Sequence, residues 1–219
     1  MNIITQNHIV ESLALSVCLI YYKSIRKSKL KSLPFFLAFI LLVELTGSYF
    51  ARLLTTNNTW LYNLSIPVEY SYYLFLFWLH GQNLLKKLTV LGFIVLIIVT
   101  IFYFFYLPIK AFHSNVLLTG QAFVIISTCI YIYELFQSAD DQPLYKNYFF
   151  WLVSGLFLFN LGEISYFVLY LSIHKNDWDS FDNLFQLINN NLLLVLYLSY
   201  IIAILICKKY EVTTNAGNH

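Results

Sequence analysis

Residues 88–107 read LTVLGFIVLIIVTIFYFFYL, twenty consecutive residues without a charged side chain. At about 1.5 Å per residue, a helix of about 20 apolar residues covers the roughly 30 Å hydrocarbon core of a bilayer. Only Gly92 and Thr100 interrupt the large apolar residues between Val90 and Tyr106, so this helix can face lipid on every side. The stretch therefore predicts a transmembrane helix.

The whole chain has the composition of a membrane protein. Of its 219 residues, 59% are hydrophobic, 19% aromatic and 11% charged, whereas a globular domain carries about 25% charged residues. Six further apolar stretches of similar length flank the first one, separated by short polar connections. We therefore expect one domain over residues 1–219, an all-α, polytopic membrane protein with seven transmembrane helices. The expected helices cover residues 3–22, 33–54, 60–79, 88–107, 116–136, 148–173 and 184–207.

The basic residues are distributed unequally between the two sides of the predicted membrane. Ten of the 13 Lys and Arg residues fall on one side, at Lys23, Arg26, Lys27, Lys29, Lys31, Lys86, Lys87, Lys146, Lys208 and Lys209. The other three, Arg52, Lys110 and Lys175, fall on the opposite side. Basic residues near helix ends are retained in the cytoplasm, so we expect the N-terminus outside and the C-terminus inside. The four tryptophans agree, since each lies at a predicted membrane boundary, where the amphipathic indole is favoured.

What the chain lacks excludes several classes of function. At a net charge of +2, the few basic residues form no face for nucleic acid, and three cysteines make no disulfide scaffold. The histidines are scattered toward helix ends without H-x-x-x-H spacing, no lysine lies at a helix centre, and no G-x-S-x-G occurs. We therefore expect no metal, no cofactor, no catalytic residue and no nucleic-acid partner. The lipid bilayer is the expected surrounding partner.

Two internal echoes indicate a repeated unit. Residues 16–22, SVCLIYY, resemble residues 127–133, STCIYIY. Glu44 followed by SYF at 48–50 resembles Glu163 followed by SYF at 165–167. These pairs fit a 3+1+3 arrangement in which the helix over 88–107 links two helix triplets. The alternative is chance similarity, which is common in apolar sequence of low complexity.

Three acidic residues lie near the middle of predicted membrane helices. A charge at the centre of such a helix costs about 2.5–3.5 kcal/mol on insertion scales, whereas one Leu or Phe contributes only about 0.3–0.6 kcal/mol. Glu44 and Glu69 lie halfway along their helices, and Glu163 lies somewhat past the middle. Given the directions of their helices, the three carboxyls reach a similar depth near the midplane and could share one polar cavity. Alternatively, each carboxyl is a packing contact, hydrogen-bonded to Tyr or Asn of a neighbouring helix.

Other polar residues share helix faces with these carboxyls. Tyr73 follows Glu69 by four residues, and Asn160 precedes Glu163 by three. The last helix adds two amides on one face of its outer third. The predicted solute-binding residues are Glu44, Glu69, Tyr73, Asn160, Glu163, Gln186 and Asn190.

Two smaller features have structural interpretations. Gly155 and Gly162, seven residues apart, predict a close contact between helices. His80 and Glu134 lie at inner helix ends, where a polar group reaches the headgroup region.

Three short motifs resemble those of a group of small bacterial seven-helix membrane proteins of unknown function. They are NNTWLYN at 57–63, PVEY at 67–70 and FWLVSG at 150–155. The resemblance implies the seven-helix fold and a multi-pass protein of the bacterial inner membrane, and it implies no activity. The 3+1+3 layout is also similar to that of SWEET and other PQ-loop transporters. Those families place prolines in four helices and a Pro-Gln pair at helix starts, whereas here only Pro67 lies deep in a helix and Gln142-Pro143 lies in a loop.

Three functions are compatible with these features. In the first, a small solute binds between the second, third, sixth and seventh helices. If the protein is a transporter, Glu69 and Glu163 would exchange protons, and Glu44 would tune the charge of these two carboxyls. Tyr73 and Asn190 would form hydrogen bonds with the solute. In the second, the same cavity belongs to a sensor that signals through a membrane partner protein, because the loops are too short for an output domain. The third, an intramembrane lipid hydrolase, has the least support, so we expect a protein that is not an enzyme.

Overall fold

The computed structural model describes residues 5–137, 143–175 and 183–216, and it contains helices and no strand in these ranges. The elements are α1 (Gln6–Ile20), α2 (Tyr22–Ile25), α3 (Leu33–Arg52), α4 (Thr59–His80), α5 (Asn83–Tyr106), α6 (Ser114–Gln137), the 3₁₀ turn η1 (Leu144–Lys146), α7 (Tyr148–Lys175) and α8 (Asn183–Ala216). Each predicted membrane helix coincides with one long helix. The short α2 continues the chain after α1. The prediction of an all-α chain is confirmed.

Five of the described helices are long and apolar enough to cross a membrane, which supports the prediction of a membrane protein. They are α3, α5, α6, α7 over Tyr148–Val168 and α8 over Gln186–Tyr210. The 15 residues of α1 span only about 22 Å. The 22 residues of α4 are sufficient in number, but polar side chains such as Asn63, Ser65 and Glu69 lower its mean hydropathy. Of the seven predicted membrane helices, the short α1 and the more polar α4 thus lie outside the set of five.

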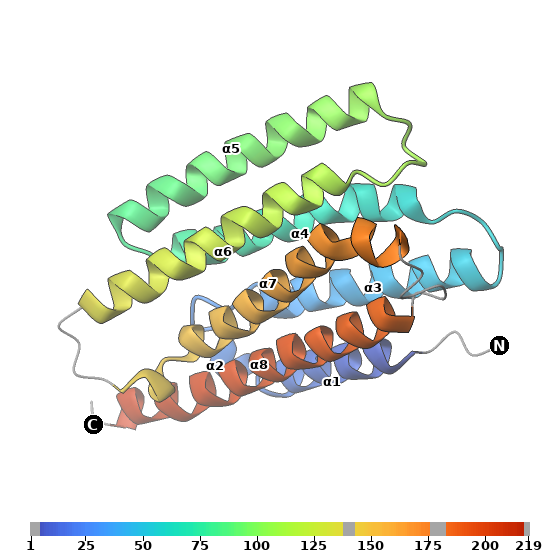
Figure 1. The fold of residues 1–219 in the computed structure, drawn as a ribbon. Coiled ribbons are helices and arrows are strands. Elements are labelled where there is room, and N and C mark those ends of the chain that lie inside the picture. Colours follow the sequence, from blue (N-terminus) through green and yellow to red (C-terminus); the bar gives the residue numbers. More distant parts are fainter. Residues whose placement is uncertain (1–4, 138–142, 176–182, 217–219) are drawn as a thin grey trace.

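Six of the long helices form a ring. Around it, α1 packs against α3, α3 against α4, α4 against α6, α6 against α7, α7 against α8, and α8 against α1. The seventh, α5, lies outside this ring against α4 and α6, at the top of Figure 1. The neighbours in α1–α3–α4 are repeated in α6–α7–α8, with α5 between the two triplets in the chain. This arrangement has the order expected of a 3+1+3 layout.

Successive long helices alternate in direction, so the bundle has two distinct ends (Figure 1). Residues 53–58 and 107–113 connect helices at one end, which we call the Asn58 end. Residues 26–32 and 81–82 lie at the opposite end, which we call the Lys29 end. At the Asn58 end, Asn63 donates to the backbone carbonyls of Ile109 (2.9 Å) and Ala111 (2.7 Å), which ties the α5–α6 connection to α4.

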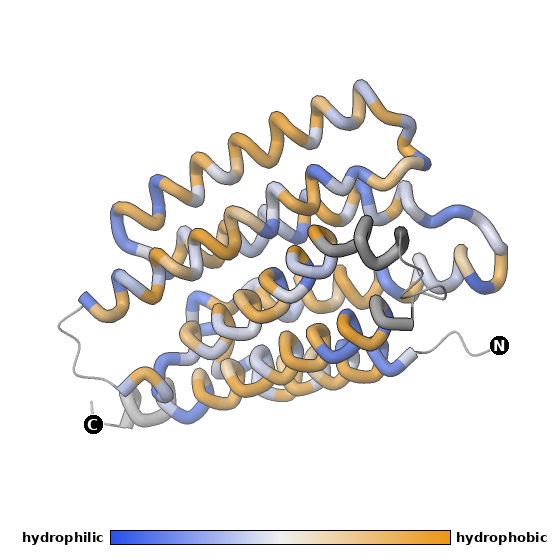
Figure 2. Tube along the Cα trace, viewed as in Figure 1, coloured by the Kyte–Doolittle hydropathy of each residue, from blue (hydrophilic) through white to orange (hydrophobic). Residues whose placement is uncertain are grey.

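The outer helix α5 is apolar along most of its length (Figure 2). It has the smallest buried share of the five apolar helices, 17%. Exposed side chains such as Phe93, Ile97 and Phe102 lie on different faces of the helix. Since large apolar side chains gain nothing from contact with water, such a helix is suited to a lipid surrounding.

The two triplets use different contacts between their second and third helices. A Cβ at Gly155 of α7 would meet the side chain of Ser199 of α8, and one at Gly162 would lie 2.6 Å from a methyl of Leu192. The close contact predicted from these two glycines is confirmed. Between α3 and α4, large rings are more prominent: Phe36 and Tyr72 stack with centroids 3.9 Å apart, and Tyr62 lies against Gly47.

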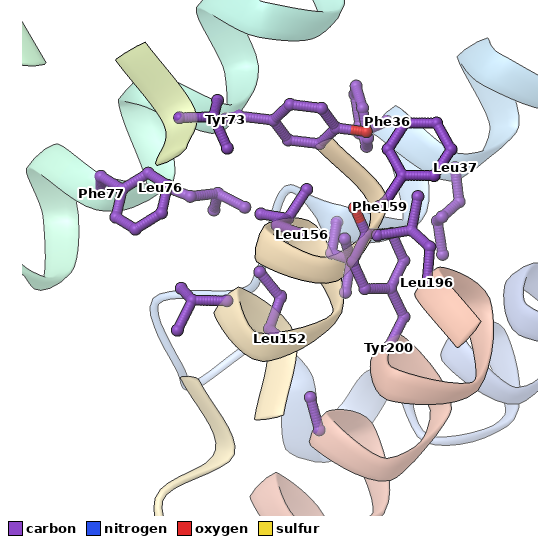
Figure 3. Close-up of a cluster of buried hydrophobic side chains, with 14 of the residues drawn as sticks. Phe36, Leu37, Tyr73, Leu76, Phe77, Leu152, Leu156, Phe159, Leu196 and Tyr200 are labelled. Atoms are coloured by element: carbon purple, nitrogen blue, oxygen red, sulfur yellow. The ribbon is translucent and has the colours of Figure 1, made fainter. Parts of the chain in front are cut away.

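Buried and mostly apolar side chains of α3, α4, α7 and α8 form a cluster inside the ring (Figure 3). We call it the apolar plug; it consists of Phe36, Leu37, Tyr73, Leu76, Phe77, Leu152, Leu156, Phe159, Leu196 and Tyr200, all buried. Phe36 precedes Glu44 by eight residues on α3, and Leu76 follows Glu69 by seven on α4. At about 1.5 Å per residue, these side chains lie about 10–12 Å closer to the Lys29 end than the two carboxyls.

Candidate functional site: carboxyl groups inside the helix ring

Four acidic side chains of different helices lie, pair by pair, within range of electrostatic interaction inside the ring. Glu69 of α4 lies close enough to Glu44 of α3 and to Glu163 of α7 for their charges to interact. Glu11 of α1 lies within the same range of Glu44 and Glu69. We call these four side chains the carboxyl cluster. The structure thus brings together the three carboxyls that the sequence singled out, with Glu69 between the other two.

The helix faces explain why these carboxyls point inward. On α1, Glu11 belongs to a buried row with His8, Ala14 and Cys18, at intervals of three or four residues. Such intervals place side chains on one face of a helix. Glu69 lies next to Tyr70 and one turn before Tyr73, both almost completely buried.

Each carboxyl of the cluster has a neutral hydrogen-bond donor. Tyr62 donates to Glu44 Oε2 (3.2 Å), Tyr73 to Glu69 Oε1 (2.7 Å) and Gln121 Nε2 to Glu163 Oε2 (2.6 Å), and the Tyr197 hydroxyl interacts with Glu11. Within the part of the chain that the structure describes, no Lys, Arg or His pairs with any of the four. Burial of several acidic groups without a basic partner is unfavourable unless a proton or a cation compensates for the charge.

Tyr73 and Asn160 take up different positions relative to the cluster. Tyr73 contacts it directly, and its hydroxyl also lies within hydrogen-bonding reach of Tyr200 across the ring. Asn160 is completely buried, accepts from the Tyr70 hydroxyl (3.1 Å) and donates to the carbonyl of Leu156 (2.7 Å). Its hydrogen bonds therefore join α7 to α4 and do not reach a carboxyl.

The two amides predicted on α8 lie farther from the cluster. Asn190 accepts from Asn7 Nδ2 (3.0 Å) and thereby connects α8 to α1 near the Asn58 end. It precedes Tyr197, the partner of Glu11, by seven residues, or about 10 Å along the helix. Gln186 is exposed. The structure thus brings Glu44, Glu69, Tyr73 and Glu163 together, places Asn160 and Asn190 around them, and leaves Gln186 on the surface.

Sequence reasoning missed Glu11 and Gln121. Glu11 carries the same signal as the other three acids, a charged residue inside a predicted membrane helix, although nearer to its start. Gln121 is the one amide in the apolar stretch 116–136 and is completely buried. The partner tyrosines Tyr62 and Tyr197 carried no comparable signal, because the chain contains 18 tyrosines.

Polar side chains line the ring between the cluster and the Asn58 end. His8 lies one turn before Glu11 and is hydrogen-bonded to Ser48 (3.3 Å). Tyr62 lies two turns before Glu69 on α4. The surroundings of the cluster are therefore polar toward the Asn58 end, whereas the apolar plug separates it from the Lys29 end.

Two other acidic or hollow features lie outside the cluster. Glu134 of α6, at the Lys29 end, accepts from the backbone N–H groups of Gln82 (2.8 Å) and Leu85 (3.1 Å) and so caps the N-terminus of α5. A groove of about 250 Å³ on the α4–α5 contact is lined by Ser71, Leu74, Phe75, Trp78, Thr89, Val90 and Phe93. None of these residues belongs to the cluster. Among the described residues, no three His, Cys, Asp or Glu side chains come together as a metal site would require.

Comparison of the chain with protein-family models, with curated proteins and with solved structures found no match in any of the three. Its function therefore has to be inferred from the geometry of the ring and of the carboxyl cluster.

Proposed function

We propose that the chain crosses the bacterial inner membrane seven times, with the Asn58 end outside and the Lys29 end in the cytoplasm. The apolar helices support insertion, and α1 with α2 covers residues 6–25, about 30 Å of helix. The basic segment 23–31 lies at the Lys29 end, as do Lys86 and Lys87 at the start of α5. This distribution is the one favoured by retention of basic residues in the cytoplasm.

We further propose that the carboxyl cluster binds a small solute and couples its passage to protons. The observation that carries this proposal is the presence of four acidic side chains in one ring, on α1, α3, α4 and α7, which interact electrostatically in pairs and whose hydrogen-bond donors are neutral groups. Acidic side chains inside a membrane bundle are costly, and they are typical of ion and proton pathways. A purely structural contact would need only one amide or hydroxyl, which costs less free energy to bury than four acids.

The proposed transport cycle begins with solute entry from the Asn58 end, where the ring is polar. Release into the cytoplasm requires the apolar plug to part. The close glycine contact joins α7 and α8, so these two helices would move together. The contact of α3 with α4 depends on large rings, which can rotate past one another, and we expect the opening there.

Proton flux in liposomes tests this function. The purified protein is reconstituted with pyranine inside the vesicles, a membrane potential is imposed with valinomycin, and proton entry is followed while amines, sugars and amino acids are added outside. We expect one class of solute to drive proton movement, and we expect Glu69→Gln and Glu163→Gln to reduce the flux at least tenfold. Glu134→Gln is the matched control, because it alters a carboxyl outside the cluster. Flux that both cluster variants retain in full would contradict the proposal.

The second candidate is a sensor that uses the same site and signals through a membrane partner. The apolar plug favours it, because the plug closes the ring below the cluster. In a sensor, ligand binding would shift helices without opening a path. Solute binding that depends on Glu69 but produces no flux, together with a stoichiometric partner recovered by cross-linking in native membranes, would select the sensor over the transporter.

A further inference from the structure

Two buried oxygen atoms in and beside the cluster have no hydrogen-bond donor among the described residues. They are Glu11 Oε2 and Gln121 Oε1. The Glu11 side chain is 3% exposed and Gln121 is fully buried, so water outside the bundle does not satisfy them. A buried acceptor without a donor is unfavourable by an amount comparable to a lost hydrogen bond. Each of these two positions therefore lacks a donor.

These two oxygen atoms come from separate parts of the ring. Glu11 belongs to α1, which packs against α3 and α8, and Gln121 belongs to α6, which packs against α4, α5 and α7. Glu69 of α4 interacts with Glu11, and Gln121 binds Glu163, so the cluster connects the two positions. A ligand that carries N–H groups would supply the missing donor at either position.

The rings beside the cluster favour positive charge. On α4, Tyr70 and Tyr73 form an edge-to-face pair with centroids 5.7 Å apart, and on α8 Tyr197 and Tyr200 form a similar pair at 5.8 Å. All four side chains are buried. The faces of aromatic rings attract cations, most strongly where water is excluded. The carboxyls without basic partners and the tyrosine rings thus both favour a positively charged ligand.

We infer, building on the proposed function, that the solute is a small organic cation whose ammonium group donates to one of the two unpartnered oxygen atoms, Glu11 Oε2 or Gln121 Oε1. Anionic solutes are disfavoured because every ionisable group of the cluster is acidic. A neutral hydroxyl compound would supply donors but would leave the charge of an ionised carboxyl uncompensated. Binding of the cation to a protonated carboxyl releases one proton to solution, so that the carboxylate and the ammonium form the new pair. Cation entry and proton exit at the same carboxyl then constitute an exchange.

Ligands matched in shape separate charge from size. Propylammonium and 1-propanol differ in charge, guanidinium and urea differ in the same way, and tetramethylammonium has the charge without N–H groups. The apparent Kd for each is obtained from the rise in the thermal midpoint of the full-length protein in detergent, followed by tryptophan fluorescence. We expect propylammonium to bind at least tenfold more tightly than 1-propanol, and its apparent Kd to increase by up to about tenfold per pH unit as the pH falls.

Variants of the cluster test the assignment of the acceptors. Glu11→Gln should weaken propylammonium binding at least tenfold, and Glu134→Gln should leave it unchanged. If Glu11→Gln does not fold, as judged by elution volume and helical circular dichroism, Gln121→Leu serves instead, because it removes the second acceptor without changing a charge. Equal binding of propylammonium and 1-propanol would overturn the inference, and tetramethylammonium binding as tight as that of propylammonium would overturn the role of the two acceptors.

The flux assay distinguishes this inference from the proposed function. Proton flux that depends on Glu69 but is driven by neutral or anionic solutes would refute the organic cation and leave the proposed function intact. Absence of flux with every solute class would contradict the transporter, whereas selective binding of propylammonium would still support the cation site.

Discussion

A carboxyl inside a membrane bundle is stable only when its oxygen atoms find partners. Glu44, Glu69 and Glu163 each accept from a hydroxyl or an amide of another position, and Glu69 has the shortest hydroxyl contact, 2.7 Å from Tyr73. These donors hold the carboxyls in fixed orientations without neutralising them. The charge of the cluster therefore depends on the protons or cations that bind to it.

Removal of the Tyr73 hydroxyl should destabilise the protein. Tyr73→Phe leaves Glu69 Oε1 without its donor, at an expected loss of about 1–3 kcal/mol in the free energy of unfolding. Denaturant titration in detergent measures the loss. Tyr133→Phe is the control, since Tyr133 is 56% exposed and its loss should change stability by less than about 0.5 kcal/mol. Equal stability of the two variants would show that the Tyr73 contact contributes nothing.

The site could be predicted from the sequence only in part. Depth along a helix identified Glu44, Glu69 and Glu163, and spacing of four residues identified Tyr73. The partners across helices could not be found in this way, since nothing local distinguishes Tyr197 from the other tyrosines. Gln186 and Asn190 share a face on α8, but that face turns toward α1 and the surface instead of toward the cluster.

At the scale of the element, contacts between helices depend on the size of a few side chains. The glycines of α7 allow α8 to approach so closely that no Cβ fits at Gly155. In α3 and α4, the rings of Phe36 and Tyr72 occupy the corresponding position between helices. The helices themselves were predictable from apolar length, and most of their bounds agree with the expected ones to within a few residues. The longest difference is at the end of α8, which continues to Ala216.

A larger side chain at the glycine contact should separate α7 from α8. Gly155→Val places two methyl groups against Ser199 and the backbone of Leu196, and we expect a loss of about 1–3 kcal/mol in unfolding free energy. Leu158→Val on the exposed face of the same helix controls for the β-branched residue. The contact would be unimportant for stability if thermal unfolding gave equal midpoints for both variants.

At the scale of the molecule, the ring order was not predictable from any single helix. Apolar length and the basic residues indicate the number and direction of crossings, but which helices become neighbours depends on side-chain shape along every interface at once. The 3+1+3 order of neighbours agrees with the echo between Glu44 and Glu163, which lie on the second helix of each triplet. The two triplets differ in the contacts between their second and third helices.

Labelling of single cysteines in cells tests the proposed topology. In a background with Cys129→Ser, since Cys129 is exposed, we introduce Thr56→Cys at the Asn58 end or Lys29→Cys at the opposite end. A membrane-impermeant maleimide should label Thr56→Cys in intact cells and Lys29→Cys only after permeabilisation. The reverse pattern would invert the orientation, and labelling of both in intact cells would exclude an odd number of crossings between them.

The position of α5 outside the ring has a consequence for the direction of the second half. Successive helices run in opposite directions. A triplet that followed directly after the first three helices would therefore begin in the direction opposite to that of the first triplet. One additional passage, made by an apolar helix that contributes no acid to the cluster, restores the starting direction (Figure 1). The second helix of each triplet, α3 with Glu44 and α7 with Glu163, therefore runs in the same direction through the molecule.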